Sequence, residues 1–488
     1  MPSCFSKSFL FCLLALFLAV RVGIMAFCSL TDPSEARYAA IGRNMAESGD
    51  FLQPRFVHNG ESIVFEGKPP LFFQMSGIAC KLFGTSEFSV RLPALIAALL
   101  ILGFLFYTVR RLRDEQMAVL ATSLCMFTGV FFLFAGICMT DLLLAACVDC
   151  AIFSYALFAS ENENRRKKIY SICYFAFLGV GMIVKGPVAL VMAGLPVFCF
   201  VLLNNRWREL KCHSWFCGII AFLAISVPWY WMMTSARPDF LEYFFINENL
   251  KRFLFKEYGD RYGEGREAFH GVAVFWTLIC TLPFNLLLAL PILSKEKRRC
   301  LLTRKGLQDS LAGLSILTIL TITLFWCMTS RVLLTYLLPI MPAFAIYLTI
   351  ILKKTGFIDD AKFVRTLSRG IVAVALLVSL FSAGAYTFGD CFKDELPGAF
   401  FRKLRNHEAF KKHNVYFVRR TPYSAEFYLG KNVRNHAPES VQTSFENSRD
   451  CILLFSDYYA DNAFPLLEKN PRRLLLKYKV WYAFAPEE

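Results

Sequence analysis

Ionisable side chains stand at the ends of long apolar blocks in this sequence, and acids and bases occur there together. They are Asp32, Glu35, Arg37, Glu66, Lys68, Asp141, Lys185, Arg252, His270 and Arg331, with the phenol of Tyr336 one turn inside its block. Charges near membrane depth are costly and usually functional. This set suits a lipid phosphate and a proton transfer, because cations hold a phosphate leaving group and a carboxylate takes a proton from an acceptor hydroxyl.

The elements that must position these groups are membrane-spanning helices. The chain has 488 residues, 56% of them hydrophobic, and the apolar residues gather in blocks of about 20, the bilayer-spanning length. We predict about eleven spans, at 8–30, 89–109, 116–135, 139–160, 169–185, 187–204, 214–234, 270–293, 310–328, 331–352 and 370–388. The predicted fold class is an all-α polytopic membrane protein. The first block carries Arg21 and lacks an Ala-x-Ala site, which favours an uncleaved anchor over a signal peptide.

Basic residues alternate between the predicted loops. Every second loop is basic, and the others are short or mixed in sign. Cytoplasmic loops carry an excess of Lys and Arg, so segments 31–88 and 235–269 and the C-terminal tail are expected outside. The net charge of +15 is explained by this alternation and needs no nucleic-acid partner. We divide the chain into a transmembrane domain, 1–388, and a small outer α/β domain, 389–488.

The outer segment 31–88 carries two helix starts. Asp32-Pro33-Ser34-Glu35 places Asp at the N-cap, Pro at N1 and Glu at N3 of a helix that stops at Gly49. Tyr38, Ile41 and Met45 form its apolar stripe, so it can lie on the membrane surface. Lys68-Pro69-Pro70 leads into a second interfacial helix, Leu71–Phe83.

The tail alternates helical and strand patterns. Ala399–Lys412 is predicted to be helical, and the predicted strands are Val415–Val418, Cys451–Phe455 and Leu474–Trp481. Cys391 and Cys451 can form a disulfide, although nothing in their spacing demands it. Cys147 and Cys150 lie inside a span and lack the second pair that a structural zinc site needs.

Each candidate residue also has a purely structural interpretation. These are a capping box for Asp32 and Glu35, headgroup contacts for Arg37, Arg252 and Arg331, a span cap for Asp141, a helix stop for Lys185 and the aromatic belt for Tyr336. For Lys68, a functional role is favoured over a structural one, because a cation is unfavourable at a helix N-terminus. Glu35 and Arg37 are two residues apart and face opposite ways on a regular helix.

A set of short motifs in order carries a family resemblance. They are Glu35-Ala36-Arg37-Tyr38-Ala39, Gly49-Asp50, Pro54, Lys68-Pro69-Pro70-Leu71, Phe83-Gly84, Arg91-Leu92-Pro93, Met139-Thr140-Asp141, Lys185-Gly186-Pro187, Arg252-Phe253, Gly259-Asp260-Arg261-Tyr262-Gly263 and Tyr336-Leu337-Leu338-Pro339. Together they resemble the lipid A aminoarabinose transferases and the wider protein O-mannosyltransferase-like group, which have the C-type glycosyltransferase fold. The resemblance covers roughly residues 30–345 and does not clearly extend to the tail.

The resemblance implies a polyprenyl phosphate-linked sugar as donor, used at the outer face of the inner membrane without a nucleotide. The family's phosphate-binding residues match Arg37, Lys68 and Tyr336. Its first outer loop carries an Asp-Glu pair, of which Glu35 matches the Glu, whereas Ser34 stands at the Asp position.

The base therefore stays open among Asp32, Glu35 and Asp141, and we place Glu35 first, because it matches the family position, and Asp32 next. Lys185, Arg252 and Arg331 are further candidates for substrate binding. A divalent metal is the one cofactor that the resemblance raises, and Glu66 and His270 are its candidate ligands, although a lone His and one Glu make no complete site.

The expected activity is transfer of a sugar from polyprenyl phosphate to a lipid, glycan or protein acceptor. The alternative is a transporter or flippase of lipid-linked sugars. That alternative predicts internal repeats or broken spans in matching halves, and the sequence shows none.

Overall fold

The computed structural model describes most of the chain. The described residues are 5–58, 61–255, 262, 267–299, 301, 303–387, 398–418, 421–430, 433–436, 451–456, 463, 467, 472–478 and 480–486. The chain forms two compact units that are discontinuous in sequence. The helical unit comprises Met1–Gly23, Glu66–Phe72 and Pro93–Ser382, and the mixed unit comprises Ile24–Phe65, Phe73–Leu92 and Ala383–Glu488. The predicted domain boundary at residue 388 stays a prediction.

Long apolar helices dominate the fold. Within the described residues, seven are long and apolar enough to span a bilayer, or up to eight if one bent pair is a single span. The seven are α1 (Lys7–Phe27), α4 (Glu87–Leu112), α7 (Thr140–Ser160), α8 (Asn164–Lys185), α11 (Trp215–Ala236), α17 (Ser310–Cys327) and α19 (Ala361–Thr387). The bent pair joins α13 (Val272–Cys280) to η2 (Phe284–Leu288) and α14 (Ala289–Leu293), with a bend of 91°. The chain is therefore a multi-pass membrane protein.

The remaining predicted spans are helical but shorter or interrupted. Predicted span 116–135 forms α5 (Glu115–Met126) and α6 (Gly129–Phe134), and 187–204 forms α9 (Val188–Leu203). Predicted span 331–352 forms η3 (Leu334–Leu337) and α18 (Ile340–Lys354). The 16 residues of α9 rise only about 24 Å at 1.5 Å per residue, less than the hydrocarbon core of about 30 Å. These segments were predicted to be spans from their apolar composition, which does not show where a helix is interrupted.

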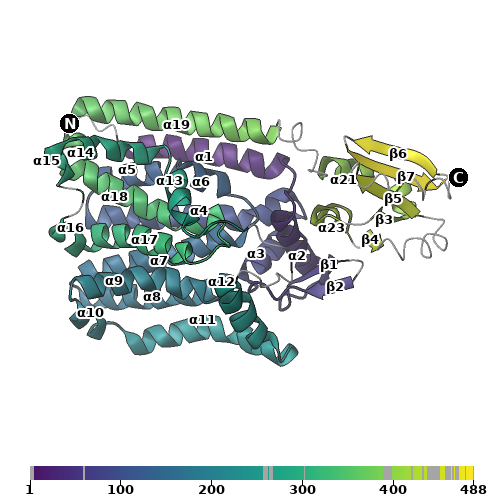
Figure 1. Cartoon of the computed structure of the whole chain (residues 1–488), viewed down its shortest axis with the longest axis horizontal. Helices are drawn as coiled ribbons and strands as arrows, with labels where there is room; N and C mark the ends of the chain where they lie inside the picture. Colours follow the sequence, from purple (N-terminus) through teal and green to yellow (C-terminus); the bar gives the residue numbers. More distant parts are fainter. Residues whose placement is uncertain are drawn as a thin grey trace. The chain divides into compact units, whose positions relative to one another are not determined.

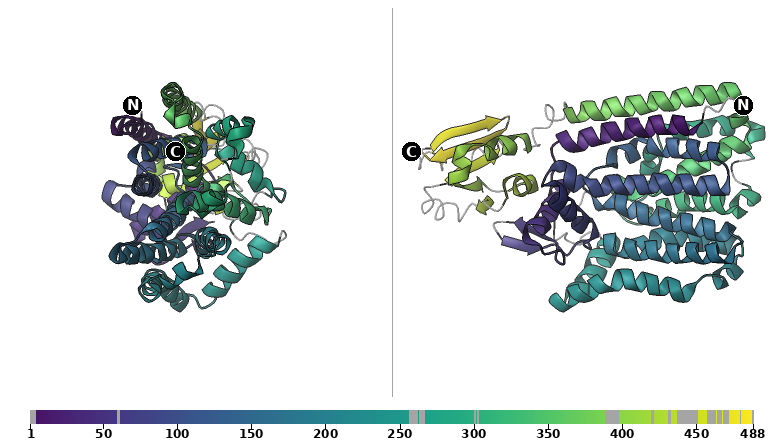
Figure 2. Two further views of the ribbon diagram at one scale, coloured as in Figure 1. Left: turned by 90° about the vertical axis from the view of Figure 1, so that its left-hand side faces the viewer. Right: turned by 180° about the vertical axis from the view of Figure 1, so that it is seen from behind.

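The helical unit is organised around α7. This helix packs against α8 and α9, while α8 packs against α11 and α17 packs against α9 and α18 (Figures 1 and 2). In α7, 94% of the most apolar 18-residue segment is buried inside the protein, compared with 28% of the corresponding segments of α1, α11 and α19. The outer helices therefore present apolar side chains such as Phe216 and Phe381 to the lipid. Arg21, in the middle of α1, is fully buried and donates through Nε to the carbonyl of Ala135.

Short helices complete the helical unit. They are α10 (Trp207–Lys211), η1 (Glu242–Lys251), α12 (Arg252–Leu254), α15 (Lys295–Arg298), α16 (Arg304–Gln308) and η4 (Phe357–Asp359). Of these, η1 is a π-helix of 10 residues. π-Helical segments are rare in proteins, and those that occur often lie at functional sites.

The N-terminal part of the mixed unit contains α2 (Ser34–Ser48), the antiparallel pair β1 (Arg55–His58) and β2 (Glu61–Val64), and most of α3 (Leu71–Phe83). The bounds predicted for α3 are confirmed, and α2 ends at Gly49 in the left-handed conformation with φ of 75°. The predicted N-cap is wrong, because α2 begins after Pro33 without a side-chain cap. The apolar stripe of Tyr38, Ile41 and Met45 is buried.

The C-terminal part of the mixed unit is a small α/β fold, as predicted. Its strands are β3 (Asn414–Val418), β4 (Val433–His436), β5 (Cys451–Ser456), β6 (Arg472–Tyr478) and β7 (Trp481–Pro486), in the order β4-β3-β5-β7-β6. The first three strands are parallel, and β7 is antiparallel to its neighbours. The helices are α21 (Gly398–Arg405), α22 (Glu408–Lys412) and α23 (Tyr423–Leu429). The predicted strand Leu474–Trp481 is thus part of the β6–β7 hairpin, and Cys391 lies outside the described residues.

Candidate functional site

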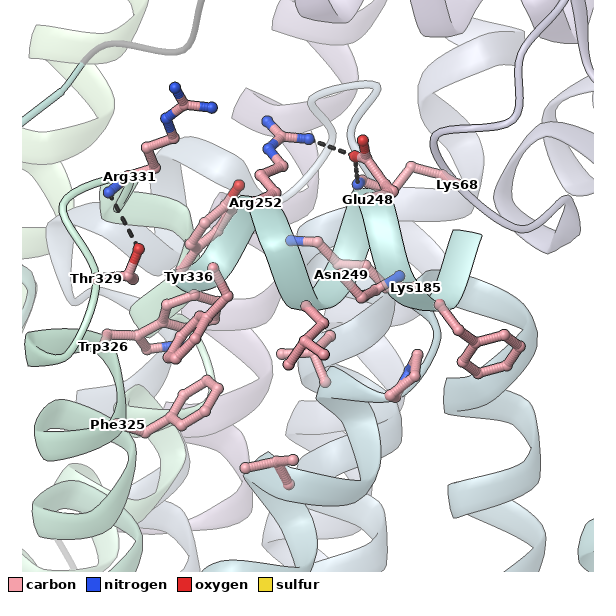
Figure 3. Close-up of a pocket in the computed structure, with 16 residues that line it drawn as sticks. Lys68, Lys185, Glu248, Asn249, Arg252, Phe325, Trp326, Thr329, Arg331 and Tyr336 are labelled. Atoms are coloured by element: carbon pink, nitrogen blue, oxygen red, sulfur yellow. Dashed lines mark hydrogen bonds and ion pairs between the residues drawn. The ribbon is translucent and has the colours of Figure 1, made fainter. Parts of the chain in front are cut away.

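A pocket of about 400 Å³ lies in the helical unit, where one end is cationic and the walls are apolar (Figure 3). Its polar lining comprises Lys68, Lys185, Glu248, Asn249, Arg252, Thr329, Arg331 and Tyr336. Its apolar lining comprises Pro187, Val188, Val191, Phe245, Leu250, Phe253, Phe325 and Trp326. Such a pocket is complementary to an amphipathic anion, with the charged group at the cationic end and an apolar chain along the walls.

Glu248 connects two of the cations. One of its carboxylate oxygens lies 3.1 Å from Lys68 Nζ and also accepts from Arg252. Glu248 is on the π-helix η1, and it is 5% exposed. Burial lowers the pKa of Lys68, and the negative charge of Glu248 opposes this shift. The carboxylate therefore keeps a desolvated amine and a guanidinium together at the cationic end.

Lys185, the last residue of α8, is held by Asp141 in the first turn of α7. The distance between Lys185 Nζ and Asp141 Oδ1 is 2.5 Å, and both side chains are buried. Gly186 follows Lys185 with φ of +86°, and a Cβ atom at this position would lie 2.6 Å from the Phe244 ring. Only glycine permits both this backbone conformation and the close approach of η1. The predicted helix stop is confirmed, and it also positions Lys185.

Aromatic side chains form the wall beside Lys185. Its amine lies 4.0 Å from the centroid of the Tyr336 ring, which is 4.6 Å from that of Trp326. Arg331 also lines the pocket, and its guanidinium lies 3.6 Å from the carboxylate of Glu267. In Figure 3, Arg331, Arg252 and Lys68 lie at the upper end, and Phe325 and Trp326 lie below. Tyr336 belongs to a 3₁₀ turn rather than to the start of a span.

Glu66 and Arg237 lie beside a second, polar cavity of about 490 Å³ in the same unit. The Glu66 carboxylate is 2.5 Å from Arg237, and the Glu66 backbone N–H donates to the Tyr262 hydroxyl. His270 is exposed. The described part of the chain holds no cluster of three or more metal-ligating side chains. These residues do not fit a metal site as they stand, and the predicted pair of metal ligands stays a prediction.

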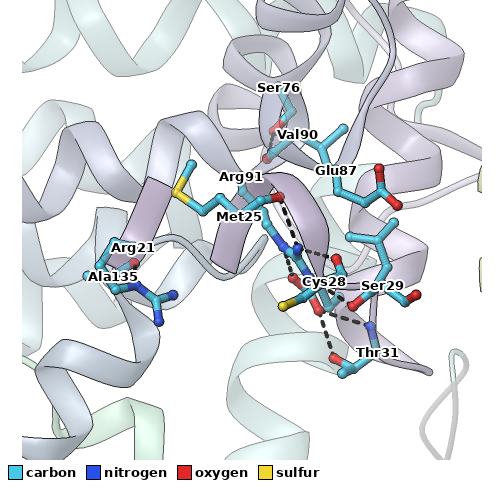
Figure 4. A network of polar contacts seen from close by, with 12 residues as sticks. Arg21, Met25, Cys28, Ser29, Thr31, Ser76, Glu87, Val90, Arg91 and Ala135 are labelled. Carbon is cyan, nitrogen blue, oxygen red and sulfur yellow. Dashed lines mark hydrogen bonds and ion pairs between the residues drawn. The ribbon is translucent and has the colours of Figure 1, made fainter. Parts of the chain in front are cut away.

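The other three candidates from the first outer segment, Asp32, Glu35 and Arg37, lie in the mixed unit. Glu35 is 3% exposed and accepts hydrogen bonds from Arg91 Nε at 2.8 Å and from the Thr31 N–H at 2.9 Å. Burial raises the pKa of Glu35, but Arg91 and Thr31 outweigh this effect, and the net shift is downward. Arg91 also donates to the carbonyls of Cys28 and Ser29 (Figure 4). Glu35 is therefore an ionised partner in a buried network.

Asp32 and Arg37 contact the C-terminal part of the same unit. Asp32 accepts a hydrogen bond of 3.1 Å from the backbone N–H of Ser424 and another from its hydroxyl. The guanidinium of Arg37 lies 5.3 Å from the ring centroids of both Phe65 and Tyr423. Both side chains thus tie α2 to α23.

The structure brings together five of the predicted site residues at one pocket: Lys68, Lys185, Arg252, Arg331 and Tyr336. Asp141 reaches this set through Lys185. Sequence reasoning missed Glu248, although its spacing of four residues from Arg252 is a signal for an ion pair on a helix. It also missed Arg91 and Arg237 as partners of Glu35 and Glu66. The motif Gly259-Asp260-Arg261 lies outside the described residues.

Comparison with known proteins finds one family model and several relatives that carry the names of sugar transferases. The profile described as dolichyl-phosphate-mannose-protein mannosyltransferase matches residues 67–231. The relative from Proteus mirabilis, named undecaprenyl phosphate-alpha-4-amino-4-deoxy-L-arabinose arabinosyl transferase 1, is 29% identical over 255 residues, 51% of this chain and 44% of that protein. The relative of the same activity from Shewanella sediminis is 28% identical over 325 residues, 65% of this chain and 55% of that protein. The chain thus spans about half the length of these relatives.

Solved structures show the fold. ArnT from Cupriavidus metallidurans, bound to undecaprenyl phosphate, superposes with a TM-score of 0.76 at 18% identity, covering 98% of each chain. The oligosaccharyltransferase from Archaeoglobus fulgidus superposes with a TM-score of 0.54 at 13% identity, covering 99% of this chain and 74% of that one. The chain has the C-type glycosyltransferase fold, and its sequence resembles the lipid A aminoarabinose transferases.

Proposed function

We propose that this protein transfers a sugar from a polyprenyl-phosphate carrier to a lipid, glycan or protein acceptor at the outer face of the inner membrane. The observation that carries this proposal is the pocket that is lined both by the cations Lys68, Arg252, Lys185 and Arg331 and by apolar side chains. A polyprenyl phosphate has this combination of a compact anion and an apolar chain. The relatives named as transferases of an undecaprenyl phosphate-linked sugar support the same donor class.

The pocket cations stabilise the leaving group. The bond between the anomeric carbon and the phosphate oxygen breaks, and negative charge grows on the phosphate as it leaves. Lys68 and Arg252 are already held side by side by Glu248, so little reorganisation is needed when this charge develops. Tyr336 supplies a hydroxyl at the same pocket.

The second half of the reaction needs an acceptor oxygen. A hydroxyl attacks the anomeric carbon, the new carbon–oxygen bond forms, and the hydroxyl proton passes to a carboxylate. A single displacement of this kind inverts the anomeric configuration. Of the three predicted bases, Asp141 is the one in the same unit as the pocket, and it contacts Lys185, which lines it. We therefore place Asp141 first, ahead of Asp32 and Glu35.

Asp141→Asn protein is expected to bind donor and to turn over about a hundredfold more slowly, because the amide keeps a hydrogen-bond acceptor for Lys185 but takes up no proton. Turnover of purified protein with a fixed donor and acceptor is the measurement. Asp114→Asn is the matched control, since Asp114 caps α5 and Asn caps equally well. Wild-type turnover in Asp141→Asn would exclude this base and leave Asp32→Asn as the next test.

The orientation of the protein follows from the basic loops. Reporter fusions after Arg113, Lys168 and Lys211 are expected to be cytoplasmic, because inner loops carry the excess of Lys and Arg. A fusion after Gly389 is expected to be external, together with the active site. Enzymatic reporters that work on only one side of the membrane provide the measurement, and a cytoplasmic signal after Gly389 contradicts the orientation.

The test of the function is a transfer assay. Envelope lipids and glycans from cells with and without the protein are compared by mass spectrometry to identify the added sugar. Purified protein in lipid nanodiscs is then given the corresponding polyprenyl-phosphate sugar and the acceptor. We expect glycosylated acceptor and free polyprenyl phosphate in equal amounts. Movement of intact donor across the bilayer without cleavage would support the transporter alternative instead.

A further inference from the structure

Glu248 places a negative charge inside the part of the pocket that is to receive a phosphate. Its Oε1 atom serves both Lys68 and Arg252, so a single carboxylate already neutralises part of the charge on two cations. A bound phosphate must share these cations with Glu248. Every additional negative charge on the ligand is then repelled by the same carboxylate.

The surroundings of Glu248 make this repulsion strong. Its side chain is 2% exposed, and its second oxygen, Oε2, is buried without a hydrogen-bond partner in the described part of the chain. Charges in such a site are screened weakly by water and salt. The carboxylate is carried by the π-helix η1 and is held by two cations.

If Glu248 served only to hold Lys68 and Arg252 in position, its side chain would not need a negative charge. A neutral amide could hold both donors through its oxygen. A charged, buried carboxylate instead lowers the total positive charge that a ligand meets. We propose that Glu248 is a specificity-determining residue, whose buried charge makes the pocket favour lipid carriers with one phosphate group over carriers with two. This inference rests on the proposed function, in which the pocket binds a polyprenyl phosphate.

The test is binding of two lipids to the full-length protein in nanodiscs. Undecaprenyl phosphate and undecaprenyl diphosphate are titrated against wild type, Glu248→Gln and Glu248→Asp, with Glu163→Gln as the control. Glu163 pairs with Arg166 on an exposed surface, so this control removes one charge away from the pocket. In Glu248→Gln, we expect the ratio of the two affinities to shift about fivefold or more towards the diphosphate. Glu248→Asp and the control are expected to keep the wild-type ratio.

A reciprocal variant keeps the test open if Glu248→Gln does not fold. Asn249→Asp adds a carboxylate at the next pocket-lining position and is expected to shift the ratio towards the monophosphate. An unchanged ratio in whichever variants fold, or an equal loss of both lipids, overturns the proposal and leaves Glu248 as a counter-ion only. Failure of the wild type to bind either lipid would instead count against the proposed function.

Discussion

Lys68→Ala protein is expected to transfer sugar about a hundred to a thousand times more slowly than wild type, because a preorganised donor to the leaving phosphate is lost. The amine of Lys68 lines the pocket and lies 3.1 Å from Glu248. Its removal also leaves the buried Glu248 with one cation fewer, which further disfavours an anionic ligand. The measurement is the turnover rate of purified, correctly folded protein at saturating donor.

Three further variants separate this effect from misfolding. Lys81→Ala is the matched control, since Lys81 packs over Phe51 and is not one of the residues that line the pocket. Lys68→Arg is expected to keep part of the activity, because the charge survives while the geometry changes. The double variant Lys68→Ala with Glu248→Gln is expected to recover part of the donor affinity, since it removes the carboxylate that has lost one of its two cations. Near-wild-type turnover in Lys68→Ala excludes Lys68 from the phosphate site.

Helices and strands were predicted well from the sequence where the apolar pattern and the residues at its ends, such as Pro and Gly, indicate the same bounds. Leu71–Phe83 was bounded by a Pro pair and a glycine, and its helix has the predicted limits. The strands β3 and β5 were marked by short apolar runs. Span counting did less well, because the apolar runs 116–135 and 331–352 are interrupted. The first is broken between Met126 and Gly129, and the second between Leu337 and Ile340.

Part of the candidate site was predictable, because charged residues at membrane depth are unusual and attract attention in a sequence. Lys68, Lys185, Arg252, Arg331 and Tyr336 were selected on this ground, and they line one pocket. Their partners were not predictable in the same way. Glu248 lies four residues before Arg252, a spacing that indicates an ion pair on a helix. This spacing does not reveal that Glu248 is buried or that it also pairs with Lys68.

The first outer segment illustrates the opposite limit. Asp32 and Glu35 fit a capping box by spacing alone, yet Asp32 accepts hydrogen bonds from Ser424, nearly four hundred positions along the chain. Glu35 pairs with Arg91 rather than with the helix start alone. A local pattern cannot reveal a competing partner that only tertiary folding brings near.

Glu35→Gln protein is expected to lose about 3–5 kcal/mol of stability, because the change leaves the buried guanidinium of Arg91 without its counter-charge. Arg91 is 2% exposed, and its Nε lies 2.8 Å from Glu35. The measurement is the thermal unfolding midpoint of purified protein. Glu47→Gln is the matched control, because Glu47 and Arg43 form a pair that is partly exposed, and such pairs contribute about 1 kcal/mol or less.

This outcome decides how the family position of Glu35 is interpreted. A catalytic base is not needed for folding, so a base would give a stable Glu35→Gln protein that binds donor and does not turn over. A structural partner gives an unstable protein whose remaining folded fraction is active. The pH dependence separates the two further. The pKa of Glu35 is lowered on folding from its usual value of 4.5, so its contribution to stability is present above that pH and is lost as the pH falls below it. Wild type is therefore expected to lose stability on acidification below pH 4.5 by more than Glu35→Gln does, and equal losses in the two proteins would mean that Glu35 does not stabilise the fold.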